Sequence, residues 1–149
     1  MISLIRTHSN NADFFQLIEE LDSFLNMRNG DLQAQYDAYN LIEKLATVVI
    51  VYHSNRAIGC GCFKEYDKNR AELKRMYVNE QFRGTGTASR LLDELEKWAT
   101  EKNYKGMILE TGVHQLEAIR FYQKNGYVII ENFDQYAGNE NSICMSKPL

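Results

Sequence analysis

The spacing of apolar residues predicts a strand and then a helix at the start of the chain. Residues 2–6 have the composition of a short strand. After Asn10 and Asn11, which suit the position before a helix, apolar side chains recur every three or four residues as far as about Met27. Residues 28–40 are polar and aromatic and predict no regular element, whereas residues 41–45 favour a short helix.

Strand-like and helix-like segments then alternate to the end of the chain. Further strands are predicted at residues 47–53, 57–66, 71–78, 107–111, 127–132 and 142–146. Further helices are predicted at residues 88–102, from an apolar stripe, and 116–125, where Gly126 is a suitable stop. This order predicts a mixed α/β (α+β) sheet with helices on its faces. The three consecutive strands favour an antiparallel meander, and the crossover after residue 78 implies one parallel pair.

Composition predicts one folded domain over residues 1–149. The chain has 17 Lys and Arg against 20 Asp and Glu, a net charge of −3, and 44% of its residues are hydrophobic. An acidic balance disfavours nucleic acid as a partner. Three cysteines, with Cys60 and Cys62 two residues apart, match no usual zinc spacing and favour a cytoplasmic protein without a metal site. The five-residue apolar run 48–52 is too short for a membrane span, and no secretory signal is recognisable.

A loop rich in glycine lies between the strand at 71–78 and the helix at 88–102. It reads Arg83-Gly84-Thr85-Gly86-Thr87. Unpaired amides at a helix N-terminus, glycines without a Cβ and a nearby arginine together suit a phosphate group. A tight turn without a ligand is the alternative. The nucleotide P-loop is excluded because no Gly-Lys-Ser/Thr follows, and Ser89 stands where a dinucleotide fingerprint needs glycine or alanine.

The loop contains the arrangement Arg83-x-x-Gly86-x-Ala88. It is preceded by residues 72–78 and followed by Phe-Tyr-Gln-Lys-Asn-Gly-Tyr at 121–127. In this combination the sequence resembles the GCN5-related N-acetyltransferase (GNAT) family. The similarity extends from about residue 48 to the C-terminus. It implies the GNAT fold, a central, mostly antiparallel sheet with one splayed parallel strand pair and helices on both faces. It also implies acetyl-CoA as cofactor, a direct transfer of its acetyl group to an amine, and, in many members, a homodimer.

The resemblance further assigns residues to the cofactor. The diphosphate of acetyl-CoA is expected on the backbone amides of the glycine loop, and the pantetheine between the splayed strands 71–78 and 107–111. The backbone of Val78 is expected to bind the thioester carbonyl and to stabilise the developing oxyanion. Gln115 replaces an asparagine that contacts the cofactor in many members. The cofactor-binding residues are thus Met76, Tyr77, Val78, Arg83, Gly84, Thr85, Gly86, Thr87, Ala88, Gln115 and Tyr122.

An acid and a base are also needed, because an alkylamine is protonated at neutral pH. Glu72 matches the general base of some family members, and strand alternation predicts that it shares a face with Lys74, Met76 and Val78. The alternatives are a solvated charge at the strand edge or a surface ion pair with Lys74. Tyr122 matches the tyrosine that protonates the leaving thiolate, and its alternative is a core aromatic residue with a satisfied hydroxyl. Cys60 and Cys62 are expected to be buried and inert.

The acceptor remains open at this point. By the resemblance, residues 28–40 and 133–141 build the acceptor pocket, where Tyr36, Tyr39, Tyr136 and Arg75 either line the pocket or face solvent. The favoured function is an acetyl-CoA:amine N-acetyltransferase acting on a small molecule. The alternatives are an acetyltransferase for a protein N-terminus or lysine, and a non-catalytic acyl-CoA-binding regulatory module.

Overall fold

In the computed structural model, which describes residues 1–29 and 45–149, seven strands form one sheet in the order β1-β2-β3-β4-β5-β7-β6. The strands are β1 (Ile2–Thr7), β2 (Val48–His53), β3 (Arg56–Glu65), β4 (Arg70–Val78), β5 (Gly106–Gly112), β6 (Val128–Ile130) and β7 (Ser142–Pro148). Neighbouring strands are antiparallel except for β4 and β5, which are parallel. The predicted mixed sheet, its meander and its single parallel pair are confirmed.

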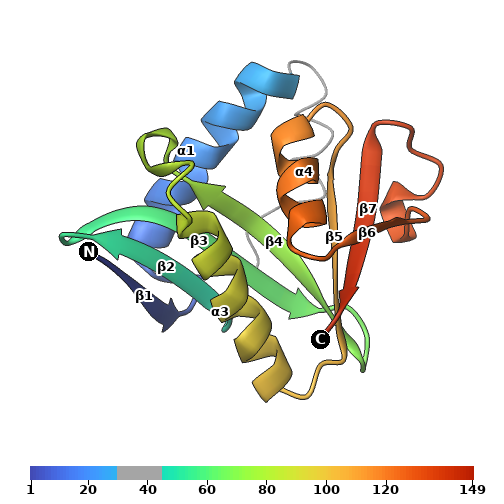
Figure 1. The fold of residues 1–149 in the computed structure, drawn as a ribbon, viewed down its shortest axis with the longest axis horizontal. Helices are drawn as coiled ribbons and strands as arrows, with labels where there is room; N and C mark the ends of the chain where they lie inside the picture. The colour runs from blue at the N-terminus through green and yellow to red at the C-terminus, as the bar shows by residue number, and fades with distance from the viewer. Residues whose placement is uncertain (30–44) are drawn as a thin grey trace.

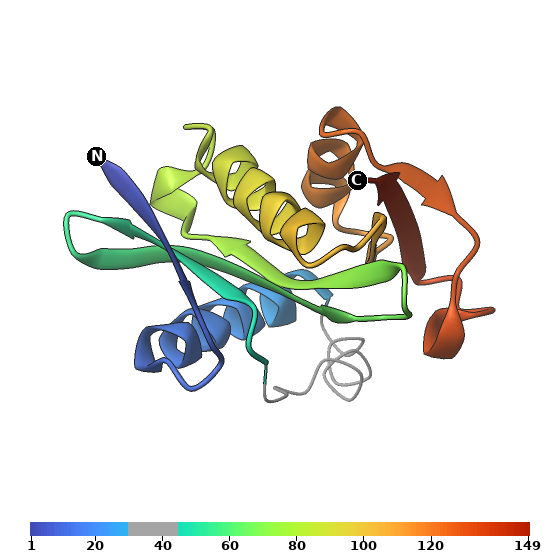
Figure 2. The ribbon, with the colours of Figure 1, turned by 90° about the horizontal axis from the view of Figure 1, so that it is seen from below.

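Helices cover both faces of the sheet, as Figure 1 and Figure 2 show. Helix α1 (Ala12–Asn29) lies on one face, and α3 (Thr87–Glu101) and α4 (Leu116–Lys124) lie on the other. Two short 3-10 turns, η1 (Glu80–Phe82) and η2 (Asp134–Tyr136), complete the described elements. The short helix predicted at residues 41–45 falls, except for its last residue, outside the described residues. None of the helices described here is both long enough and apolar enough to cross a membrane.

The predicted helix ends follow from local chemistry. The Asn11 side chain accepts a hydrogen bond from the backbone N–H of Asp13 (2.8 Å), so it supplies one partner for the open amides at the start of α1. Gly126, with φ of +95°, follows the end of α4 and adopts the left-handed conformation that glycine allows. Sequence signals therefore located the start of α1 and the end of α4.

The larger core lies between the sheet and helices α3 and α4. Leu91, Leu92 and Leu95 of α3 are completely buried there. Trp98, predicted to belong to the core stripe, lies at its edge, where its ring packs against Phe63. A second cluster, between the sheet and α1, contains Phe14, Leu17, Ile18, Val48, Ile50, Cys60 and Cys62.

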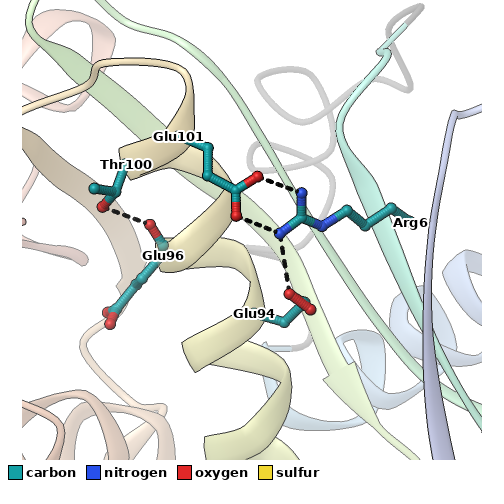
Figure 3. Close-up of polar contacts among 5 residues, drawn as sticks. All are labelled: Arg6, Glu94, Glu96, Thr100 and Glu101. Carbon is teal, nitrogen blue, oxygen red and sulfur yellow. Dashed lines mark hydrogen bonds and ion pairs between the residues drawn. The ribbon is translucent and has the colours of Figure 1, made fainter.

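Arg6 joins strand β1 to helix α3 on the outside of the larger core (Figure 3). Its guanidinium pairs with Glu101 at 2.8 Å and with Glu94 at 3.1 Å, and it lies 4.9 Å from the centre of the Trp98 ring. The same figure shows Thr100 donating a hydrogen bond to the backbone carbonyl of Glu96 within α3. These contacts hold the edge strand against the helix.

A bulge in β4 changes which of its residues share a face. Cys60 pairs with Tyr77 and Cys62 with Lys74, so two residues of β4 lie opposite Gly61. Arg75 takes up the extra residue with φ of +59°. As a result, Ala71 and Leu73 before the bulge and Met76 and Val78 after it all belong to the core beneath α3 and α4. The predicted common face for Glu72, Lys74, Met76 and Val78 is therefore wrong, because simple alternation does not continue through a bulge.

Candidate active site

The parallel strands β4 and β5 separate after a short region of pairing. Their register covers only residues 70–72 against residues 106–108. Figure 1 shows the two strands close together at one end and apart at the other. A cleft of about 480 Å³ opens beyond the paired region and extends from the glycine loop to α1. The predicted site residues that line it are Glu72, Met76, Tyr77, Val78, Arg83, Gly84, Gly86, Ala88, Gln115 and Tyr122.

The glycine loop is open above its backbone. Gly84 and Gly86 have φ of +75° and +83°, and among the described residues beyond its chain neighbours a Cβ added at either position would meet no heavy atom within 4 Å. Gly86 precedes α3, whose first amides have no partner within the helix. Thr85 and Thr87 do not line the cleft, and their hydroxyl groups bond each other at 2.9 Å. The left-handed turns thus leave a concave amide surface at a helix N-terminus.

Arg83 bridges the loop and the end of β4. Its Nε donates a hydrogen bond to the carbonyl of Val78 (2.9 Å). Its guanidinium lies 4.4 Å from the ring centre of Phe24 on α1 and 5.9 Å from that of Tyr77. The cation that the sequence indicated is therefore held against the strand end and two aromatic rings, at the wall of the cleft.

Tyr122 is buried on α4, with its ring packed edge-on against Phe121 and Tyr127. Burial raises the pKa of its phenol far above the ordinary value. Its hydroxyl forms no hydrogen bond with another residue of the described ranges. The side chain thus belongs to the core beneath α3 and α4 and also lines the cleft. Gln115, also buried, stands immediately before α4 on the same wall.

Two carboxylates, one buried and one partly buried, lie on the opposite side of the strands from the α3 core. Glu72 is only 5% exposed, so the alternative of a solvated charge is wrong. Glu110 of β5, which the sequence analysis missed, also lines the cleft. Burial raises the pKa of the Glu110 carboxyl to about 7; the Ser142 hydroxyl, which donates to Oε2 at 2.8 Å, and the Lys74 ammonium oppose that rise, whereas the Glu72 carboxylate adds to it. The available signal was a single carboxylate directly after the apolar residues 107–109 of the strand predicted at 107–111.

The acceptor side of the cleft is only partly described. Tyr36 and Tyr39 lie outside the described residues. Tyr136 lies on η2 and is 1% exposed, so for this residue a solvent-facing position is wrong. Arg75 also lines the cleft, and its guanidinium pairs with Asp22 of α1 at 3.0 Å. The guanidinium of Arg75 thus already has a carboxylate partner from the protein.

The thiols contribute no nucleophile to this cleft. Cys60, Cys62 and Cys144 are buried, and none forms a disulfide. Burial raises the pKa of Cys60 well above the ordinary thiol value. Within residues 1–29 and 45–149, no group of three or more His, Cys, Asp or Glu side chains is arranged to hold a metal ion.

Comparisons with known proteins give a consistent result. The sequence profile of the acetyltransferase (GNAT) family matches residues 13–127. The chain is 33% identical over 140 residues to the IAA acetyltransferase of Azospirillum brasilense, covering 90% of this chain and 89% of that protein. A Klebsiella pneumoniae structure described as an acyl-CoA N-acyltransferase superposes with a TM-score of 0.83 at 30% identity, covering 100% of this chain and 98% of the other. A streptothricin acetyltransferase of Bacillus anthracis, solved with acetyl coenzyme A, matches 69% of this chain and 62% of its own at 29% identity and a TM-score of 0.62.

Proposed function

The chain belongs to the acetyltransferase (GNAT) family, and from this premise we propose that it transfers the acetyl group of acetyl-CoA to a primary amine of a small molecule. The amine attacks directly while both substrates are bound. One observation carries the proposal: a single cleft connects the glycine loop, the end of β4, Tyr122 and the carboxylates of Glu72 and Glu110. The acetyl coenzyme A held by the Bacillus anthracis neighbour supports the identity of the donor.

The glycine loop suits the diphosphate of acetyl-CoA. Among the described residues beyond their chain neighbours, no atom would obstruct an anion above Gly84 or Gly86, since even an added Cβ meets nothing within 4 Å. The N-terminal amides of α3 provide donors and the positive end of a helix dipole. Arg83 adds a positive charge at the same end of the cleft. The backbone of residues 83–88 therefore holds the phosphates.

The end of β4 suits the thioester. When bound, acetyl-CoA supplies an activated acetyl group, whose carbonyl oxygen gains negative charge as the amine adds. The backbone N–H of Val78, with Met76 and Tyr77 beside it, is assigned to this oxygen. A preorganised donor of this kind contributes about 3 kcal/mol to transition-state stabilisation in other enzymes.

The carboxylates on β4 and β5 suit the proton of the amine. A primary alkylamine has a pKa of about 10 and reaches the cleft as an ammonium ion. Glu110, with a pKa of about 7, is an effective proton acceptor at neutral pH. Burial is the main cause of that raised pKa, and Glu72, predicted as the base, adds a smaller contribution in the same direction. We assign proton removal to this pair, with Glu110 holding the proton.

Tyr122 is assigned to protonate the leaving group, the thiolate of coenzyme A. Its raised pKa keeps the phenol protonated, and its hydroxyl has no competing partner among the described residues. As the C–S bond breaks, this hydroxyl passes its proton to the departing thiolate, and the second proton released by the new amide nitrogen restores the phenol. The side chain of Gln115, on the same wall, is assigned to contact the cofactor.

The test is thiol release from acetyl-CoA with a panel of small primary amines and with a peptide bearing a free N-terminus and a lysine. Wild type, Tyr122→Phe and the control Tyr104→Phe are compared, since Tyr104 lies outside the cleft and its hydroxyl donates to Glu65. We expect release with small amines, a fall of about 100-fold in kcat for Tyr122→Phe, and no change for the control. Calorimetry should give equal acetyl-CoA affinity for all three.

Three outcomes would contradict parts of this proposal. Preference for the peptide would replace the small-molecule acceptor by a protein one. Binding of acetyl-CoA without thiol release for any acceptor would indicate a regulatory module. Wild-type rates in Tyr122→Phe would remove Tyr122 from the mechanism.

A further inference from the structure

The segment Cys60-Gly61-Cys62 of β3 lies opposite the bulge of β4. Cys60 pairs with Tyr77 and Cys62 with Lys74, so the two cysteines bracket the extra residue. Both side chains are completely buried in the cluster beneath α1. Their spacing of two residues directs both thiols to one face of β3.

The thiols bond the backbone at the bulge itself. Cys62 Sγ donates to the carbonyl of Lys74 at 3.3 Å, and Cys60 Sγ donates to the carbonyl of Arg75 at 3.5 Å. A bulge interrupts the regular ladder, and a buried carbonyl without a donor destabilises the fold. The two S–H groups therefore provide hydrogen-bond donors at the place where β3 and β4 lose their regular register.

The glycine between the cysteines completes the fit. A Cβ on Gly61 would come within 2.7 Å of both Met76 Sδ and Leu95 Cδ1. A larger residue at this position would require the ends of the Met76 and Leu95 side chains to shift. Arg75, whose φ of +59° is unfavourable for a residue with a side chain, is held from the other face by Asp22. Contacts from both faces of the sheet thus maintain the bulge.

The bulge decides how the end of β4 meets the cleft. Pairing with β5 ends at Glu72, just before it, and the residues from Leu73 to Val78 all line the cleft. Without the bulge, Met76 and Val78 would exchange faces with Tyr77. The direction of the backbone amides assigned to the thioester therefore depends on this one extra residue.

We propose that Cys60 and Cys62 are positioning residues, whose S–H groups hold the β4 bulge so that the backbone from Met76 to Val78 faces the thioester. The role of this backbone toward the thioester rests on the proposed function. The thiols take no part in the chemistry. Their effect is transmitted through the carbonyls of Lys74 and Arg75.

The experiment compares Cys60→Ala/Cys62→Ala with the conservative Cys60→Ser/Cys62→Ser and with a packing control, Val48→Ala. Val48 is the β2 partner of Cys62 and belongs to the same buried cluster, but it lies on the strand that does not contact β4. Amide hydrogen exchange at residues 76–78 reports the bulge directly. Acetyl-CoA affinity by calorimetry, with kcat and KM, reports its consequence for the site.

We expect the double alanine variant to speed exchange at residues 76–78 by about tenfold and to lower kcat/KM by about 10- to 100-fold, since a displacement of about 1 Å has effects of this size. The double serine variant should stay within about threefold of wild type, because a hydroxyl also donates to these carbonyls. Val48→Ala should leave the exchange at residues 76–78 and kcat/KM unchanged, even though it lowers the stability of the protein.

Equal effects of Val48→Ala and the double alanine variant would reduce the cysteines to core packing and overturn the proposal. Unchanged exchange in the double alanine variant would overturn it as well. Failure of the wild type to bind acetyl-CoA would instead overturn the proposed function, and the exchange measurement would still decide whether the thiols hold the bulge.

Discussion

Replacing Glu110 by glutamine separates the chemistry of the cleft from its stability. Glutamine has nearly the same shape, and its carbonyl oxygen can still accept the Ser142 hydroxyl that bonds Glu110 at 2.8 Å. The substitution therefore removes mainly a buried negative charge. We expect an enzyme that is more stable than wild type at neutral pH and nearly inactive.

The size of the effect follows from the raised pKa. In an unfolded chain the Glu110 carboxyl has the ordinary pKa of 4.5 and loses its proton there, whereas the folded protein keeps the proton until about pH 7. Between these values the folded state binds more protons, so the free energy of unfolding falls as the pH rises. At 1.36 kcal/mol per unit, the loss amounts to roughly 3 kcal/mol above pH 7. Glu110→Gln should recover roughly that amount at about pH 8 and almost nothing at about pH 4.

The assay is urea unfolding of both proteins at several pH values across that range, with kcat measured in parallel. Ser142→Ala is a second variant, which should lower rather than raise the free energy of unfolding at high pH. Its lost hydroxyl no longer favours the carboxylate, so the pKa of Glu110 rises further and the loss of stability extends to higher pH. For Glu110→Gln we expect kcat to fall by about 100-fold or more with unchanged acetyl-CoA affinity.

Two results would refute this reasoning. A stability difference that is the same at about pH 4 and pH 8 would show that Glu110 does not titrate differently in the folded protein. Wild-type activity in Glu110→Gln would place the base elsewhere, and Glu72→Gln would then be the variant to measure.

Three further predictions concern the loop and two ion pairs, each measured by denaturation. Gly86→Ala should cost about 1 kcal/mol of stability, since its φ of +83° disfavours a side chain, and calorimetry should show weaker acetyl-CoA binding. Glu96→Ala should cost about 3 kcal/mol, because this buried carboxylate accepts from Tyr127 and Lys147, both at 2.8 Å, and its loss leaves them unpaired. Arg6→Ala should lower Tm only slightly, and the difference should shrink in high salt because its partners are near the surface.

Most of the fold was predictable because its signals are local. The apolar stripe of α3 and the left-handed Gly126 after α4 depend on neighbouring residues alone. The glycine loop likewise combines a required backbone conformation with a position before a helix, and both are visible in the sequence. The site residues drawn from the family resemblance line one cleft, apart from Thr85 and Thr87.

The bulge and the acidic pair were not predictable in the same way. Arg75 belongs to no sequence class that favours a left-handed backbone, and its conformation follows from how β3 and β4 pair around Gly61. The pKa of Glu110 depends on its burial and on Glu72, 38 positions away in the sequence. Neither property can be obtained from the residues on either side.

The sequence by itself determined the order of strands and helices, the single parallel crossover and the loop that suits a diphosphate, because periodicity and glycine conformation act over a few residues. Only the tertiary structure decided which side of β4 each residue faces and which carboxylate titrates near neutral pH. Strand register and burial are set by contacts between distant segments, so they exist only once those segments have packed together.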